Sequence, residues 1–145
     1  MEKSVCIISG STLGGAEYVA EHCEGILNQA GIKTALCHGA QEAQNEAHHH
    51  DVWLFVSSTH GAGDLPDNLM PFFDDLHVPE GLQFGVIGLG NSDYDTFCFA
   101  VDKIETALLA QGAKLLCPSL KIDVLQTHDP ESEAQEWLPT LITAL

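Results

Sequence analysis

Residues 9–17, SGSTLGGAE, have the composition of an anion-binding loop. They follow a short apolar run and precede a helical pattern, so the segment leads into a helix N-terminus. Free backbone N–H groups and the positive end of the helix dipole favour an anion there. Ser11 and Thr12 add hydroxyl groups, and Gly14 and Gly15 allow the backbone to approach a ligand closely. An ordinary strand-to-helix turn with a hydroxyl cap is the alternative interpretation.

The anion that fits this loop best is a single phosphate monoester. The loop contains no Lys and no Arg, which disfavours a nucleotide di- or triphosphate, and no Arg is available for the 2′-phosphate of NADP. The Gly-Lys-Ser/Thr ending of a Walker loop and the G-x-G-x-x-G fingerprint of a Rossmann fold are both missing.

Two further segments rich in Gly, Ser, Thr and Asn follow apolar runs, SSTHGAGDLPDN at 57–68 and GLGNSDYDTFC at 88–98. In a doubly wound sheet, ligands bind at the carboxyl ends of the strands, beside the point where strand order reverses. Tyr94 could stack on a flat heterocycle there, with an exposed turn aromatic as the alternative. A phosphate at the first loop and a flat ring at the other two together predict flavin mononucleotide (FMN).

Alternating strand and helix patterns predict the scaffold that carries these three loops. Strands are expected at 4–9, 33–39, 52–58, 84–90 and 113–123. Helices are expected at 14–30, around 69–76, at 96–111 and from 129 to the end. This order is typical of an α/β fold with a doubly wound parallel sheet and helices on both faces, in one domain spanning residues 1–145.

On the first helix, six residues are expected to share the buried face: Ala16, Val19, Ala20, Cys23, Leu27 and Ala30. Gly31 is expected to end this helix, and Gly112 the one at 96–111.

Several single residues predict how the other elements begin, end or break. Asp64 or Asp67 is expected to cap the third helix, and Pro71 to delay or kink it. Pro118 interrupts the fifth strand and should place it at an edge. The run His48–His50 is expected in a solvated loop before the third strand, without a metal, because no carboxylate or cysteine stands beside it at ligand spacing.

The charge of the chain restricts its partners. Five Lys and 21 acidic residues give a formal net charge of −16. Such a surface repels nucleic acid and anionic membranes and attracts a basic protein. The simpler explanation of the many acidic residues is that they only keep the protein soluble.

Cysteine usage and the N-terminus suggest a cytoplasmic protein. Cys6, Cys23, Cys37, Cys98 and Cys117 form no C-x-x-C pair, so we expect reduced thiols that are mostly buried. The N-terminal residues do not form a signal peptide, and no apolar stretch approaches the ~18–20 residues of a membrane span.

The sequence closely resembles the flavodoxins, and the resemblance covers essentially the whole chain. GSTLGGAE is similar to the family's GSTTGNTE phosphate loop, and GLGNSDYDTFC to its G-x-G-x-S-x-Y-x-x-F-C ring-binding loop. Without an insertion in the fifth strand, the chain resembles the short-chain members. The resemblance implies a five-stranded parallel sheet in the order 2-1-3-4-5 and FMN as cofactor.

The resemblance also implies the cofactor-binding residues. Those around the phosphate would be Ser11, Thr12, Leu13, Gly14, Gly15 and Ala16. Those along the inner face of the flavin ring, after the third strand, would be Ser58, Thr59, His60 and Gly61. Those on the outer face and pyrimidine edge would be Leu89, Gly90, Asn91, Tyr94, Phe97 and Cys98, with Tyr94 stacking.

Three of these positions depart from the family pattern and predict weaker FMN binding. Gly15 and Ala16 replace the usual Asn and Thr, which removes two side-chain hydrogen bonds. At ~0.5–1.5 kcal/mol net for each bond, the affinity should fall by roughly 5- to 150-fold. His60 replaces the bulky aromatic often found on the inner face, which removes a stacking contact.

The resemblance implies an electron carrier rather than an enzyme. No Ser–His–Asp set, paired carboxylates or substrate pocket is recognisable in the sequence. The expected partners of this monomer are a basic NADPH-dependent flavodoxin reductase and an acceptor enzyme. Biotin synthase is the expected acceptor, because several runs are most similar to small bacterial members associated with biotin synthesis. The alternatives are an FMN-dependent NAD(P)H:quinone reductase and a flavin-free binding module on the same fold. A phosphoacceptor receiver domain is excluded, because it would need an acidic cluster after the first strand and the sequence has none there.

Overall fold

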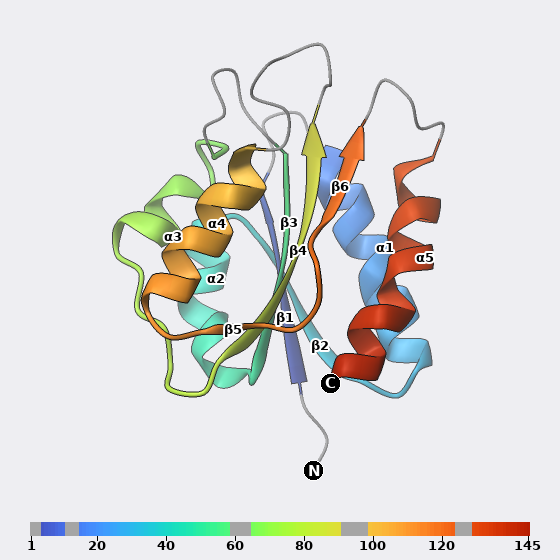
Figure 1. Ribbon diagram of the computed structural model, residues 1–145, viewed down its shortest axis with the longest axis horizontal. Helices are drawn as coiled ribbons and strands as arrows, with labels where there is room; N and C mark the ends of the chain where they lie inside the picture. Colours follow the sequence, from blue (N-terminus) through green and yellow to red (C-terminus); the bar gives the residue numbers. More distant parts are fainter. Residues whose placement is uncertain (1–3, 11–14, 59–64, 91–98, 124–128) are drawn as a thin grey trace.

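The computed structural model describes residues 4–10, 15–58, 65–90, 99–123 and 129–145. At its centre lies one parallel sheet (Figure 1). The strands are β1 (Ser4–Gly10), β2 (Lys33–His38), β3 (Val52–Ser58), β4 (Gln83–Gly90), β5 (Lys114–Leu115) and β6 (Leu120–Asp123). The main path runs β2-β1-β3-β4-β5, and β6 also pairs with β4. The predicted order 2-1-3-4-5 is confirmed.

The fifth strand position is divided between two short strands. β5 pairs with the start of β4, with Gln83 opposite Lys114, and β6 pairs with its end, with Ile87 opposite Leu120. Pro118 lies between them and has no N–H to donate to a ladder. The edge position was predicted correctly, whereas a single continuous fifth strand was wrong.

Helices cover both faces of the sheet, as predicted. The helices are α1 (Gly15–Gln29), α2 (Ala40–Glu46), α3 (Met70–Asp74), α4 (Phe99–Ala110) and α5 (Pro130–Ala144), with the 3-10 turn η1 (Ala47–His49) after α2. α1 and α5 lie on one face, and α2, α3 and α4 on the other (Figure 1). Each face has its own apolar core, one around Trp53 and Phe55 and the other around Leu27 and Leu54. Among the described helices, none is both long and apolar enough to span a bilayer.

α1 matches the prediction closely because its apolar spacing is regular. Ala16, Val19, Ala20, Cys23 and Leu27 are all buried in the core beneath the helix. Ala30 was predicted on the same face but is exposed, because it follows the last helical residue. Gly31 then takes φ +82°, and Gly112 takes φ +91° after α4, so both glycines end their helices as expected.

The sequence did not predict α2, and this changes the description of the histidine run. The helix buries only Ala40 and Ala43, whose small side chains give little apolar periodicity. His48 and His49 lie in the turn η1 rather than in a loop, and both are exposed. His50 is half-buried, and its Nε2 lies 2.9 Å from Glu46 Oε1. No group of three metal-binding side chains occurs among the described residues.

The N-cap that we predicted for the third helix is not formed by Asp67. The N-cap of α3 is Leu69, without a side-chain hydrogen bond, so Asp67 does not cap it, and Asp64 lies outside the described residues. Pro71 stands in the first turn, where a missing N–H costs little, so the helix starts late as expected. α5 begins at Pro130, close to the predicted start at 129, and Asp129 caps it because its carboxylate accepts the Ser132 N–H, a cap that the sequence analysis did not name.

Four cysteines are free and buried, as predicted, and Cys98 lies outside the described residues. Cys6 and Cys37, on neighbouring strands, have their Sγ atoms 3.7 Å apart. The hydrogen bond between the two thiols, together with burial, raises the pKa of Cys6, whereas the same hydrogen bond lowers the pKa of Cys37 against the opposing effect of burial. Burial alone raises the pKa of the Cys23 thiol to about 12.

We expect Cys23 to resist alkylation in the folded protein, because the thiolate is the reactive form and burial suppresses it. At pH 8, iodoacetamide should modify Cys23 on the order of 1000-fold more slowly in the native chain than in urea, in proportion to the smaller thiolate fraction. Peptide mass spectrometry measures both rates in one sample. Equal native and unfolded rates would show that the thiol is not buried in solution.

Candidate functional site

Three strands end side by side at the carboxyl edge of the sheet. Gly10 at the end of β1 pairs with Ser57, and Ser58 at the end of β3 pairs with Leu89, next to the end of β4 at Gly90. The register therefore brings the starting points of the three predicted ligand loops together, in the order β1, β3, β4. A ligand spanning the three loops is compatible with this arrangement.

Most of the predicted cofactor residues lie outside the described residues. They are Ser11, Thr12, Leu13, Gly14, Thr59, His60, Gly61, Asn91, Tyr94, Phe97 and Cys98. The described ones are Gly15, Ala16, Ser58, Leu89 and Gly90. Their proposed roles toward a ligand therefore stay predictions, and the structure supplies the scaffold on which these residues stand.

At the start of α1, an anion could be bound by backbone groups rather than by side chains. The helix begins at Gly15, so the N–H groups of its first turn have no partner within the helix. The Ala16 side chain is fully buried in the core. Ala16 can therefore approach a phosphate only through its backbone, and this agrees with a loop that lacks the family's usual Thr.

Gly10 is held tightly where β1 ends. A Cβ added at Gly10 would lie 2.8 Å from both Cβ and Cδ2 of Leu69, which is itself fully buried. On the neighbouring strand, the Ser58 hydroxyl donates to the Gly10 carbonyl at 3.5 Å. The strand end that leads into the predicted phosphate loop therefore has space only for glycine.

Ser9, His38 and Glu21 form a polar set that the sequence analysis missed. Ser9 Oγ lies 2.6 Å from His38 Nδ1, and His38 Nε2 lies 3.7 Å from Glu21 Oε1. The three come from β1, β2 and α1, and only the β1–β2 register brings Ser9 and His38 together. Because Ser9 has no exposed surface, it cannot act as a nucleophile toward a substrate in solution. No local sequence spacing could have revealed this set.

Two lysines of the described chain, Lys33 and Lys114, begin β2 and β5, which puts them toward the opposite edge of the sheet. Lys121 lies opposite Gly88 of β4, near the carboxyl edge, and its Nζ lies 3.5 Å from Asp102 Oδ1. A phosphate at the carboxyl edge would depend on N–H and hydroxyl donors, and the Gly, Ser and Thr of the first loop are suited to this.

Comparisons with known proteins give a consistent result. The chain matches the Flavodoxin family model over residues 7–137. It is 54% identical to a MioC homolog of Haemophilus influenzae, over 97% of this chain and 98% of that protein. It is 47% identical to the MioC protein of Escherichia coli, over 97% of each chain. A flavodoxin from Pseudomonas aeruginosa, solved as a cysteine mutant, superposes with a TM-score of 0.87 at 37% identity, covering 98% of both chains.

Gly10→Ala should destabilise the chain because the new methyl group overlaps Leu69 at its Cβ, which cannot swing away. We expect a loss of about 1–3 kcal/mol in the free energy of unfolding, measured by urea denaturation. Gly25→Ala is the matched control, because nothing lies within 4 Å of its added Cβ. On an exposed helix it should stabilise by roughly 0.5–1 kcal/mol. A Gly10→Ala variant as stable as wild type would show that the strand end is loosely packed.

Proposed function

The chain belongs to the flavodoxin family, whose members bind FMN and carry electrons, and we propose that this chain does both. In this proposal, residues 1–145 act as one FMN-binding unit. The observation that carries it is the register of β1, β3 and β4, whose ends start the three motif loops side by side. FMN, when bound, supplies the redox chemistry, and the protein's task is to hold and orient it.

The phosphate would be held at the first loop without a cation. Ser11 and Thr12 would donate hydroxyl hydrogen bonds, and Leu13, Gly14, Gly15 and Ala16 would contribute backbone N–H groups at the start of α1. The buried Ala16 side chain and the glycine at 15 leave fewer donors than the family pattern supplies. This supports weak FMN binding, with the protein purified partly as apoprotein.

The flavin ring would lie between the loops after β3 and β4. The inner face would meet Ser58, Thr59, His60 and Gly61. The outer face and pyrimidine edge would meet Leu89, Gly90, Asn91, Tyr94, Phe97 and Cys98. Tyr94 would stack on the ring, since an aromatic side chain combines a large contact area with a flat shape.

The acidic surface supports a role as a carrier between proteins. A charge of −16 attracts basic partners and gives transient, salt-sensitive contacts. We propose an NADPH-dependent flavodoxin reductase as the electron donor and an acceptor enzyme, such as biotin synthase, as the recipient. The free buried thiols agree with the reducing cytoplasm as the compartment. A quinone reductase that bound NADPH directly would need basic groups for its phosphates, and Lys33 and Lys114 lie toward the other edge.

The deciding experiment is a fluorescence titration of FMN and of riboflavin with apoprotein. FMN fluorescence should be quenched on binding, and riboflavin should bind at least about tenfold more weakly, because it lacks the phosphate. Thr12→Ala should weaken FMN by about 2- to 13-fold and leave riboflavin unchanged. If neither flavin is quenched, the chain is the flavin-free binding module. Equal affinities would contradict a phosphate site in the first loop.

Electron transfer from the reductase should depend strongly on salt. With NADPH and the reductase in place, the second-order rate constant for reduction of the FMN-loaded protein should fall at least about tenfold between 20 and 300 mM NaCl. Stopped-flow absorbance of the flavin measures this rate. A salt-independent rate would leave solubility as the explanation of the acidic surface. Rapid turnover of NADPH and a quinone without any reductase would instead support the enzyme alternative.

A further inference from the structure

We propose that His38 is a positioning residue for the phosphate site and acts through Ser9. This inference rests on the proposed function, because it concerns the loop that would hold the FMN phosphate. In it, the contact between the His38 ring and the Ser9 hydroxyl fixes the end of β1, from which the loop begins. His38 itself touches neither the phosphate nor the flavin.

The residues at the end of β2 hold Ser9 in two ways. Its hydroxyl lies 2.6 Å from His38 Nδ1, and its carbonyl oxygen accepts the Gly39 N–H at 2.8 Å. Ser9 is fully buried, and a buried hydroxyl without a partner costs about 1–3 kcal/mol. Ser9 and His38 are also direct register partners. The end of β1 is therefore tied to β2 through both side chain and backbone.

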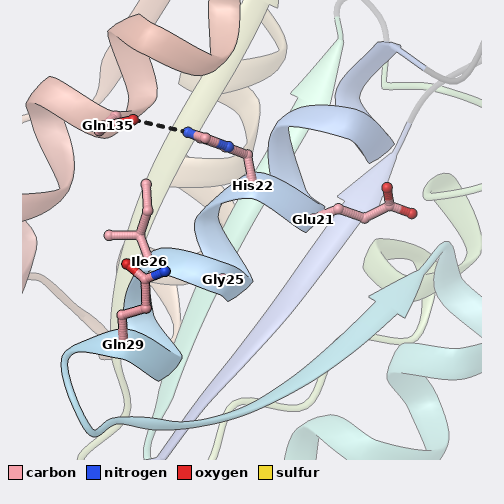
Figure 2. A pocket seen from close by; sticks show the side chains of 6 residues that line it. All are labelled: Glu21, His22, Gly25, Ile26, Gln29 and Gln135. Atoms are coloured by element: carbon pink, nitrogen blue, oxygen red, sulfur yellow. Dashed lines mark hydrogen bonds between the residues drawn. The ribbon is translucent and has the colours of Figure 1, made fainter.

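In this proposal Glu21 biases which His38 nitrogen carries the proton. Its carboxylate lies 3.7 Å from Nε2, which is too long for a good hydrogen bond but places a negative charge on that side of the ring. A negative charge there favours a proton on Nε2, so in the neutral ring Nδ1 accepts and the Ser9 hydroxyl donates. In Figure 2 the side chains of Glu21 and His22 extend from α1 in different directions, and His22 points toward Gln135 of α5.

This contact should affect the phosphate more than the ring. Ser9 is followed by Gly10, already confined by Leu69 and Ser58, and then by the proposed phosphate donors Ser11 and Thr12. The loops that would hold the ring start from β3 and β4, whereas Ser9 and His38 belong to β1 and β2. Loosening the end of β1 should therefore disturb mainly the pre-organisation of the phosphate donors, because the ring loops keep their own strand ends on β3 and β4.

Three variants separate this role from a general structural one. His38→Asn places an amide near the position of Nδ1 and keeps a partner for Ser9. His38→Gln places its amide toward Glu21 instead and leaves Ser9 without one. Ser9→Ala removes the hydroxyl itself. The matched control is His22→Asn, one residue after Glu21, whose ring contacts Gln135 at 3.1 Å on the far side of the helix (Figure 2).

The measurement is the dissociation constant of FMN and of riboflavin for each apoprotein. We expect His38→Gln and Ser9→Ala to weaken FMN by about 2- to 13-fold, with riboflavin changed less than twofold. His38→Asn should recover most of the FMN affinity, and His22→Asn should equal wild type. The His38→Gln/Ser9→Ala double variant should lose no more than either single variant, because both remove the same contact.

An independent readout uses the apoprotein alone. In ¹⁵N-labelled wild type, the neutral His38 ring should carry its proton on Nε2, with Nδ1 as the acceptor. Glu21→Gln should reduce that preference. A wild type that binds FMN, with His38→Gln weakening both flavins equally or neither, would overturn the inference and leave the proposed function intact. The opposite tautomer would also overturn it. If the wild type binds no FMN, the proposed function and this inference fail together.

Discussion

The parallel register of β1, β3 and β4 is the constraint on which the rest of the structure depends. Each strand is covered by helices on both sides, so its interior must be apolar, and side chains such as Trp53, Phe55 and Phe84 are fully buried. Polar and chemically useful groups are therefore confined to the strand ends. Because parallel strands all end in the same direction, these groups collect at one edge. A shift of one residue in the β1–β3 pairing would turn every β1 side chain to the opposite face.

The end of β1 shows how tightly this edge is built. Leu69 excludes any side chain at Gly10, Ser58 donates to the Gly10 carbonyl, and residues 38 and 39 hold Ser9. These contacts come from three elements that are far apart in sequence. A loop that binds an anion with neutral donors depends on such support, because each hydrogen bond is worth little unless its donor is already in place.

The sequence predicted those features that arise from local chemistry. The strong apolar runs predicted the strands, the regular spacing of α1 predicted its buried face, and Gly31 and Gly112 predicted helix ends. It failed where structure depends on contacts across the fold. α2 has only small alanines facing the core, and α3 begins at Met70 after the buried N-cap Leu69, where tertiary packing replaces a polar cap. The Ser9–His38 contact joins residues 29 positions apart, and no local pattern encodes such a pairing. For the same reason the loop motifs could be recognised only by resemblance, whereas their common edge follows from the register.

The charge distribution links weak cofactor binding to strong reducing power. A phosphate held by N–H and hydroxyl groups keeps its own negative charge, and Lys33 and Lys114 lie toward the other edge of the sheet. The chain adds a further −16. An electron placed on a flavin in this field is held less tightly than in water, so the proposed carrier would donate it more readily. The same field attracts a basic partner that can receive the electron. A cation added to tighten FMN binding would therefore make the reduced flavin a weaker electron donor. It would also weaken the docking of the basic partner that precedes electron transfer.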